Sequence, residues 1–208
     1  MTTVQIVRAE TADADIAADL IGEAFQTLAP AEWLVPNPAQ RSFVLPANFR
    51  IHVEHAVLIG EVHMTADRSA VAVWLPRDRP LPDPARYDTR LALACGQWAD
   101  RFRALDSLSK AYRPTLPHHH LTVLAVRPDR QGRGLGSALL RHYHALLDER
   151  RMPAYLEASS PRSRDLYLRH GYQLYGAPFT VPNGAPLWPM WRQPVSQVAP
   201  PSAAISSW

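Results

Sequence analysis

Glycine residues between positions 131 and 137 give this chain its clearest chemical signal. The segment Gln131-Gly132-Arg133-Gly134-Leu135-Gly136-Ser137 follows an apolar run that ends at Val126 and precedes a segment with helical periodicity. A glycine-rich turn before a helix directs several backbone N–H groups, and the positive end of the helix dipole, toward one point. Because glycine has no Cβ, an anion can approach these N–H groups closely. The segment therefore predicts a site for the phosphate groups of a cofactor.

Two common phosphate-binding patterns fit this segment less well. A P-loop ends in Gly-Lys-Ser/Thr, whereas the only lysine of this chain is Lys110. The dinucleotide pattern G-x-G-x-x-G needs a glycine at Ser137, and its turn follows the strand directly. Here five residues separate Val126 from Gly132. Glu157 stands where the ribose-binding acid of that pattern would lie, so a nucleotide-binding oxidoreductase remains an alternative.

A second motif occupies residues 154 to 171. Ala154–Ala158 is expected to be a short strand. Ser160 suits the N-cap of a following helix, and Pro161 suits its first position. Gly171 stands where such a helix would end in a left-handed residue. Tyr167 therefore lies in the second turn of a helix of about ten residues.

The two motifs together resemble the GNAT acetyltransferase superfamily. The likeness rests on Val126-Arg127-Pro128, on the pattern Gln/Arg-x-x-Gly-x-Gly/Ala at residues 131 to 136, and on Leu166-Tyr167 followed by Gly171-Tyr172. It extends from Val71 to about Arg192. The resemblance implies a single domain of the α/β (α+β) class with a mixed central sheet of about seven strands, flanked by helices. In that family the sheet splays open between its fourth and fifth strands.

The resemblance also implies acetyl-CoA as the co-substrate and no metal. The backbone of Leu124, Ala125 and Val126 would pair with the pantetheine amides. Tyr167 would stand beside the CoA sulfur as general acid. The pyrophosphate would lie on the loop formed by Gln131, Gly132, Arg133, Gly134, Leu135, Gly136 and Ser137.

Two further segments, Ala70–Trp74 and Leu156–Arg162, are similar to puromycin N-acetyltransferase-like members of the family. This likeness implies an enzyme that acetylates the amine of a small molecule. The amine would attack the thioester directly and form a tetrahedral intermediate. A non-catalytic acyl-CoA-binding module of the same family is the alternative, because such a module would keep the glycine loop without needing Tyr167 or a base.

Three consecutive histidines open the predicted fourth strand. Alternation along a strand puts His118 and His120 on one face with Thr122 and Leu124, and His119 on the other. A histidine ordinarily titrates near pH 6.5 and can accept the proton of an ammonium group. Arylalkylamine acetyltransferases resemble this arrangement, with two strand histidines two residues apart. That resemblance favours His120 over His118 as general base, although Thr122 replaces the second histidine; Glu157 is a reserve candidate. Successive strand residues diverge, so the three histidines are not expected to share a metal.

Composition is that of a globular protein with 208 residues and a formal net charge of +3. We expect residues 1–194 to form the domain and residues 195–208 to be a disordered tail, because the tail consists largely of small and polar residues and contains prolines. No basic block or apolar span predicts binding to nucleic acid or to a membrane. Cys95 is the only cysteine and is expected to be a small buried residue. A cytoplasmic monomer or homodimer follows as the expectation.

The remaining elements follow from periodicity and from proline positions. We expect strands at Thr3–Arg8, 61–65, 69–76, 119–126 and 187–192, and helices from about 13 to 28, 39 to 58 and 85 to 112. Residues 30–38 should form a proline-rich break, and Pro46 should interrupt or bend the second helix. The first helix should bury Ile16, Leu20, Ala24 and Leu28 on one face.

Aromatic and histidine side chains in the early helices have two possible roles. They could line an apolar pocket for the acceptor, or they could belong to the core, which is the commoner role at such spacing. The residues concerned are Trp33, Phe43, Phe49, His52 and His55. Their spacing does not identify the acceptor.

Overall fold

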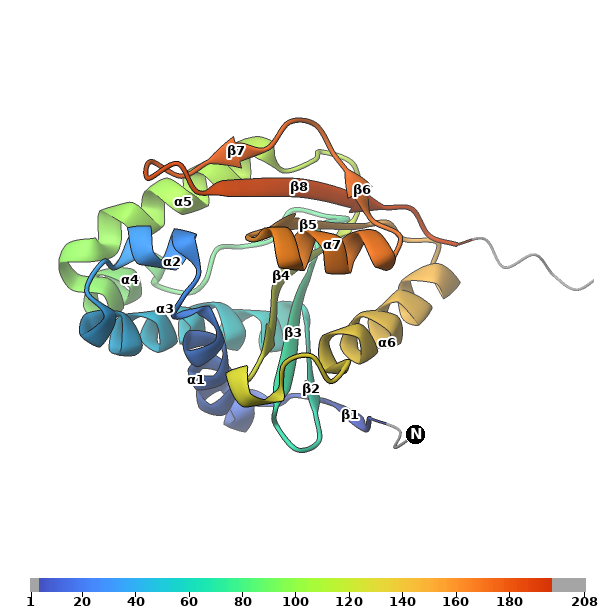
Figure 1. Cartoon of the computed structure of the whole chain (residues 1–208), viewed down its shortest axis with the longest axis horizontal. Coiled ribbons are helices and arrows are strands. Elements are labelled where there is room, and N and C mark those ends of the chain that lie inside the picture. The colour runs from blue at the N-terminus through green and yellow to red at the C-terminus, as the bar shows by residue number, and fades with distance from the viewer. Residues whose placement is uncertain (1–3, 196–208) are drawn as a thin grey trace, which may run out of the picture.

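The computed structural model describes residues 4–195, which form a mixed sheet with helices on both faces (Figure 1). The strands are β1 (Ile6–Arg8), β2 (Glu61–Thr65), β3 (Ala70–Pro76), β4 (His119–Val126), β5 (Ala154–Ala158), β6 (Gln173–Leu174), β7 (Phe179–Thr180) and β8 (Pro186–Arg192). The α-helices are α1 (Ala14–Phe25), α2 (Ala29–Leu34), α3 (Pro38–Ile59), α4 (Tyr87–Cys95), α5 (Ala99–Tyr112), α6 (Leu135–Glu149) and α7 (Pro161–Arg169). Thr3, expected to open the first strand, and tail residues 196–208 lie outside the described residues.

The strand order is β1-β2-β3-β4-β5-β8-β6, and β7 pairs with β8. Only β4 and β5 are parallel among the described pairs, and all the other pairs are antiparallel. The expected mixed sheet flanked by helices is confirmed. A dinucleotide-binding fold needs repeated βαβ units, and a sheet with one parallel pair does not provide them.

Each face of the sheet packs against its own pair of helices. Helices α1 and α3 cover one face, where Val71 and Val73 are buried with Val123 and Ala125. Helices α6 and α7 cover the other, where the Trp74 and Tyr143 rings stack with their centroids 4.3 Å apart. Apolar burial of this kind is the main favourable term in folding. The two apolar faces therefore fix β4 between two helical layers.

Helix α3 runs through Pro46, so of the two expected outcomes, an interruption or a bend, the interruption is wrong. The neighbouring helix α1 passes very close to α3 at this point. A Cβ placed on Gly22 of α1 would lie only 2.5 Å from Pro46 Cγ. The proline ring thus packs where glycine leaves room. This tertiary contact supports a continuous helix despite the backbone hydrogen bond that proline removes.

Three other local expectations need correction. The proline-rich break contains α2, with Pro30 in its first turn, where a missing N–H costs little. The expected helix from 85 to 112 is two helices, because Gly96 takes a left-handed φ of 50° and turns the chain between α4 and α5. Ile16 is exposed, since α1 buries Ala17, Leu20 and Ile21 instead.

Cys95 is buried, as expected, and burial raises the pKa of its thiol to about 12. A thiol with so high a pKa is not a nucleophile at neutral pH. None of the helices in residues 4–195 combines the length and the apolar character that crossing a membrane would require.

Three buried histidines should make the fold sensitive to acid. Burial lowers the pKa of His63 and His118 to about 4 and that of His144 to about 3. An unfolded histidine titrates near 6.5, so between these values the unfolded state binds more protons and stability falls as the pH falls. Each histidine should lower the free energy of unfolding by about 1.4 kcal/mol per pH unit between pH ~6 and ~4.

Urea unfolding at several pH values measures this slope. His144→Gln keeps a polar partner for the Tyr172 hydroxyl, which lies 3.1 Å from His144 Nε2. In the variant, the free energy of unfolding should therefore change less steeply with pH, by the contribution of one histidine, about 1.4 kcal/mol per pH unit. An unchanged slope in the variant would contradict the account.

Candidate active site

Strands β4 and β5 pair at one end only. His119 pairs with Ala154 and His120 with Tyr155, and no later residues of the two strands are in register. Figure 1 shows the two strands leaving this point in different directions. The β5 side of β4 from Leu121 to Val126 therefore keeps a strand edge that no described strand covers. An open edge of this kind can pair with the amide groups of a ligand.

A β-bulge interrupts the pairing of β3 and β4 beside this opening. Val73 pairs with Val123 but Trp74 pairs with Leu121, so Thr122 is the extra residue. Bulges re-aim side chains and often lie next to active sites. The Thr122 hydroxyl donates to the carbonyl of Val73 at 3.1 Å.

The bulge changes which residues share a face of β4. Leu121 and Leu124 both pack in the cluster against α6 and α7. Strict alternation would have put Leu124 on the face of His118 and His120, so that expectation is wrong. The extra residue shifts the alternation by one position. His120, before the bulge, faces away from this cluster, because its neighbour His119 contacts Tyr143 of α6.

The glycine loop has the backbone that its sequence predicts. Gly132 and Gly134 take left-handed φ values of 77° and 81°, and α6 begins directly after Gly134. A Cβ on either residue would meet no other atom within 4 Å. The loop therefore borders open space at the N-terminus of α6, a helix of fifteen residues. Open space at a helix N-terminus is the arrangement that binds phosphate. Gly136 is buried, and its added Cβ would contact Leu124 and Val126 of β4.

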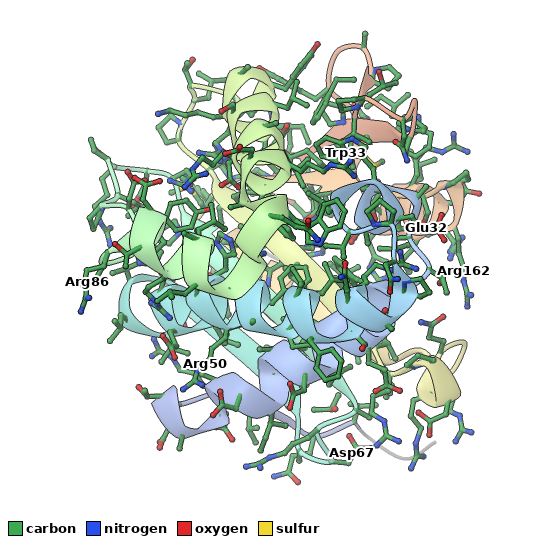
Figure 2. The ribbon with its side chains drawn as sticks, turned by 90° about the vertical axis from the view of Figure 1, so that its left-hand side faces the viewer. Glu32, Trp33, Arg50, Asp67, Arg86 and Arg162 are labelled. Carbon is green, nitrogen blue, oxygen red and sulfur yellow. The ribbon has the colours of Figure 1, made fainter. Side chains whose placement is uncertain are left out.

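Hydrogen bonds to β4 and to α7 hold the loop. Gln131 donates to the carbonyl of Val126 at 3.2 Å and accepts from Arg162 of α7 at 3.3 Å. Figure 2 shows Arg162 on the side of the molecule where the glycine loop lies. The Ser137 hydroxyl lies 2.9 Å from His170 Nε2. Arg133 is exposed. Of the predicted cofactor residues, Gln131 and Ser137 thus also tie the loop to β4 and to the end of α7.

Tyr167 lies on α7 as the capping signals predict. Ser160 caps the helix by accepting from the Ser163 N–H at 3.1 Å, and Gly171 follows it with φ of 84°. Tyr167 is 7% exposed, and its ring makes an edge contact with Tyr172. Burial raises the pKa of Tyr167, so its hydroxyl stays protonated at neutral pH. Within residues 4–195 this hydroxyl has no hydrogen-bond partner, which leaves its proton available.

His120 and Glu157 form a buried pair across the β4–β5 opening. His120 Nε2 lies 2.9 Å from Glu157 Oε2, and their side chains are 4% and 11% exposed. Burial raises the pKa of Glu157, but its interactions with His120 and the nearby charge of Arg113 outweigh burial, and the pKa lies below its usual range. Glu157 is therefore an anion at neutral pH. Sequence alone placed both residues among the base candidates; the structure brings them together.

The other two histidines are less suited to take a proton. His118 is buried, its Nδ1 lies 2.6 Å from the carbonyl of Leu116, and its pKa is lowered to about 4. His119 faces the opposite side, where its Nδ1 lies 2.9 Å from the Tyr143 hydroxyl. Burial also lowers the pKa of His119. The three histidines therefore diverge, and no group of three or more metal-binding side chains occurs in the part of the chain that the structure describes.

The early aromatic residues do not gather into one pocket. Phe43 is 78% exposed. Phe49 packs edge-on against Phe25 in the core. Trp33 lies on α2 and packs beside the β7–β8 hairpin, as Figure 2 indicates. The shared acceptor pocket is therefore not formed by this set.

Part of this chain matches a known protein family, and the whole fold matches solved acetyltransferase structures. Residues 99–174, which span α5 to β6, match the model of the acetyltransferase (GNAT) domain family. A crystal structure from Corynebacterium glutamicum, described as histone acetyltransferase HPA2 and related acetyltransferase, superimposes with a TM-score of 0.71. It is 28% identical and covers 95% of this chain and 100% of its own. The chain has the GNAT acetyltransferase fold.

Two more distant acetyltransferase structures share the architecture. Arylalkylamine N-acetyltransferase 2 from Aedes aegypti has a TM-score of 0.58 at 13% identity, with 93% of this chain and 100% of that chain covered. The PaiA N-acetyltransferase from Thermoplasma acidophilum, solved with coenzyme A, has a TM-score of 0.58 at 8% identity, with 92% and 99% covered. At such identities these two matches show the shared fold alone.

Proposed function

We propose that this protein is a cytoplasmic acetyl-CoA-dependent N-acetyltransferase that acetylates the amine of a small molecule. The observation that carries the proposal is the buried pair of His120 and Glu157 at the point where β4 and β5 separate. Tyr167 lies on the side of the sheet covered by α6 and α7, and His120 faces the other side. A general base must reach the attacking amine and a general acid must reach the leaving sulfur, so the two residues would act on different atoms.

The residues present fit acetyl-CoA. Gly132 and Gly134 leave open space where a Cβ would stand, at the N-terminus of α6, which suits a pyrophosphate. The uncovered edge at Leu124, Ala125 and Val126 can pair with pantetheine amides. Acetyl-CoA supplies the activated acyl group. The likeness of Ala70–Trp74 and Leu156–Arg162 to puromycin N-acetyltransferase-like members supports a small-molecule acceptor.

His120 would act as the general base. Its Nε2 is oriented by the Glu157 carboxylate, and its Nδ1 is buried without a partner among the described residues. The negative charge of Glu157 favours the imidazolium that forms when His120 takes the proton. This pair replaces the two-histidine arrangement that Thr122 breaks in the sequence.

Tyr167 would return a proton to the leaving thiolate. Tyrosine is protonated at neutral pH already at its ordinary pKa near 10. Burial raises the pKa of Tyr167 further, which keeps the proton on the hydroxyl and makes it a weaker acid. Backbone N–H groups along the bulged part of β4 would stabilise the oxyanion of the tetrahedral intermediate.

A screen of amines tests the function. Purified protein is mixed with acetyl-CoA and single amines, and released CoA is measured with a thiol reagent while mass spectrometry identifies the N-acetyl product. We expect amine-dependent CoA release. Tight acetyl-CoA binding without release for any amine would instead support the non-catalytic module, and binding of NAD but not CoA would support the oxidoreductase.

The base assignment predicts an effect on turnover. His120→Ala should lower kcat/KM at neutral pH by about 10²-fold, the lower end for a lost general base. Glu157→Gln removes the negative charge that would stabilise the imidazolium formed when His120 takes the proton, so kcat/KM should also fall. His118→Ala is the matched control and should keep kcat/KM close to wild type. If His120→Ala retains the full rate, the base lies elsewhere.

A further inference from the structure

Five buried polar atoms without a hydrogen-bond partner gather near the paired end of β4 and β5. Nine such atoms occur in the part of the chain described, and most buried polar groups in folded proteins are satisfied. The five are Nε of Arg77, Nε of Arg113, Nε2 of His118, Nδ1 of His120 and Oε1 of Glu157. Such a concentration points to a polar ligand that completes the site.

The fold brings these residues together from four segments. Arg77 follows β3, and its N–H donates to the carbonyl of His118 at 2.7 Å. Arg113 follows α5, where the carbonyl of Tyr112 accepts from the Tyr155 hydroxyl at 3.4 Å. The Tyr155 ring in turn lies 5.2 Å from the ring of His120. The two arginines therefore flank the base from the ends of β3 and α5.

Neither guanidinium has an ion-pair or hydrogen-bond partner among residues 4–195. Arg192, by contrast, binds both oxygens of Asp148 at 2.8 and 2.7 Å. Burial lowers the pKa of Arg77 to about 10, and the charge of Arg113 adds to this, while Asp83 and Glu157 attract Arg77 only from a distance. Both arginines are half-buried, and burying positive charge without an anion in contact is costly. Glu157 is the anion of this cluster, but it contacts neither guanidinium, so the charges of Arg77 and Arg113 are not matched by a contacting anion of residues 4–195.

We propose that Arg77 and Arg113 bind a carboxylate of the acceptor, so that the substrate is an amino acid or a similarly small amine with a carboxylate. This inference rests on the proposed function, because the amine must reach His120. The backbone of Arg77 contacts the carbonyl of His118, two residues before His120, so the carboxylate and the amine of a small acceptor would both lie at this end of β4. The nearby Glu157 anion disfavours a doubly charged phosphate more than a singly charged carboxylate.

Matched acceptor pairs test the proposal. Amino acids are compared with their decarboxylated amines, for example leucine with 3-methylbutylamine and phenylalanine with 2-phenylethylamine. Wild type should prefer the carboxylated member in kcat/KM by about 10- to 100-fold, the effect of one or two charge-assisted hydrogen bonds. Arg77→Met and Arg113→Met should lower kcat/KM for the amino acid more than for its decarboxylated amine, and so lose this preference. The ratio of kcat/KM for the amino acid to kcat/KM for its decarboxylated amine is taken for wild type and for each variant. Dividing the wild-type ratio by the variant ratio cancels the different basicity of the two amines.

Controls separate the possible failures. Arg79→Met alters an exposed arginine two positions away, paired only with Asp78, and should keep the preference. Calorimetry of amino-acid binding gives a readout without turnover, and acetyl-CoA binding shows that each variant is folded. Arginine-dependent amino-acid binding without turnover would support this site and contradict the proposed function. Equal use of both acceptors by wild type and variants, or preference for an aminophosphonate, would overturn the carboxylate site.

Discussion

Tyr167→Phe should lower kcat by about 10²–10⁴-fold, the usual effect of losing a general acid. The change keeps the ring, which is buried against Tyr172, and removes only a hydroxyl that has no partner among the described residues. Because no hydrogen bond is lost, the fold and the affinity for acetyl-CoA should stay close to wild type. Steady-state kinetics together with calorimetry of acetyl-CoA binding measure both quantities.

Tyr172→Phe is the matched control for this prediction. Tyr172 is as deeply buried and lies in the same cluster, but its hydroxyl contacts His144 at 3.1 Å. The control should lose some stability and little turnover. If kcat of Tyr167→Phe stays within about twofold of wild type, Tyr167 is a packing residue and the acid assignment is wrong.

Gly134→Val should weaken acetyl-CoA binding by about 10²–10⁴-fold. The added side chain would stand in the open space that the loop borders, and it would displace a pyrophosphate from two or more backbone N–H groups. Each charge-assisted hydrogen bond contributes about 1.5–3 kcal/mol, so the loss of two gives an effect of this size. Calorimetry with acetyl-CoA measures the change directly.

Backbone strain is the competing cause, since Gly134 has a left-handed φ of 81° that valine tolerates poorly. Gly176→Val provides the control. Gly176 has φ of 76° and equally open surroundings, but it lies between β6 and β7. It should cost similar stability and leave the affinity for acetyl-CoA unchanged. Equal affinity of Gly134→Val and wild type would refute the phosphate site at this loop.

Local signals in the sequence determined the elements that carry the candidate site. Ser160, Pro161 and Gly171 bracket α7 because caps and left-handed turns depend on the residue itself and its immediate neighbours. The glycine loop was predicted for the same reason, and so was the place of Tyr167 within its helix. The strands from Glu61 to Pro76 and from His119 to Val126 followed from apolar runs and turn residues.

Only the tertiary structure decided how these elements meet. The bulge at Thr122 moved Leu124 to the other face of β4, and no local residue preference signals an extra residue in strand pairing. Helix α3 passes through Pro46 because Gly22 of another helix leaves room for the ring. Both outcomes depend on a partner that is distant in the sequence.

The same reason explains the chemistry of the site. His120 and Glu157 are 37 residues apart, and they meet only because β4 and β5 pair in one register at that end. Arg77 and Arg113 reach the same place from β3 and α5, although neither lies in a recognisable motif. Residue types and spacing determined which groups were available. Strand register and the separation of β4 from β5 determined which of them share one site, because these contacts are set by long-range pairing.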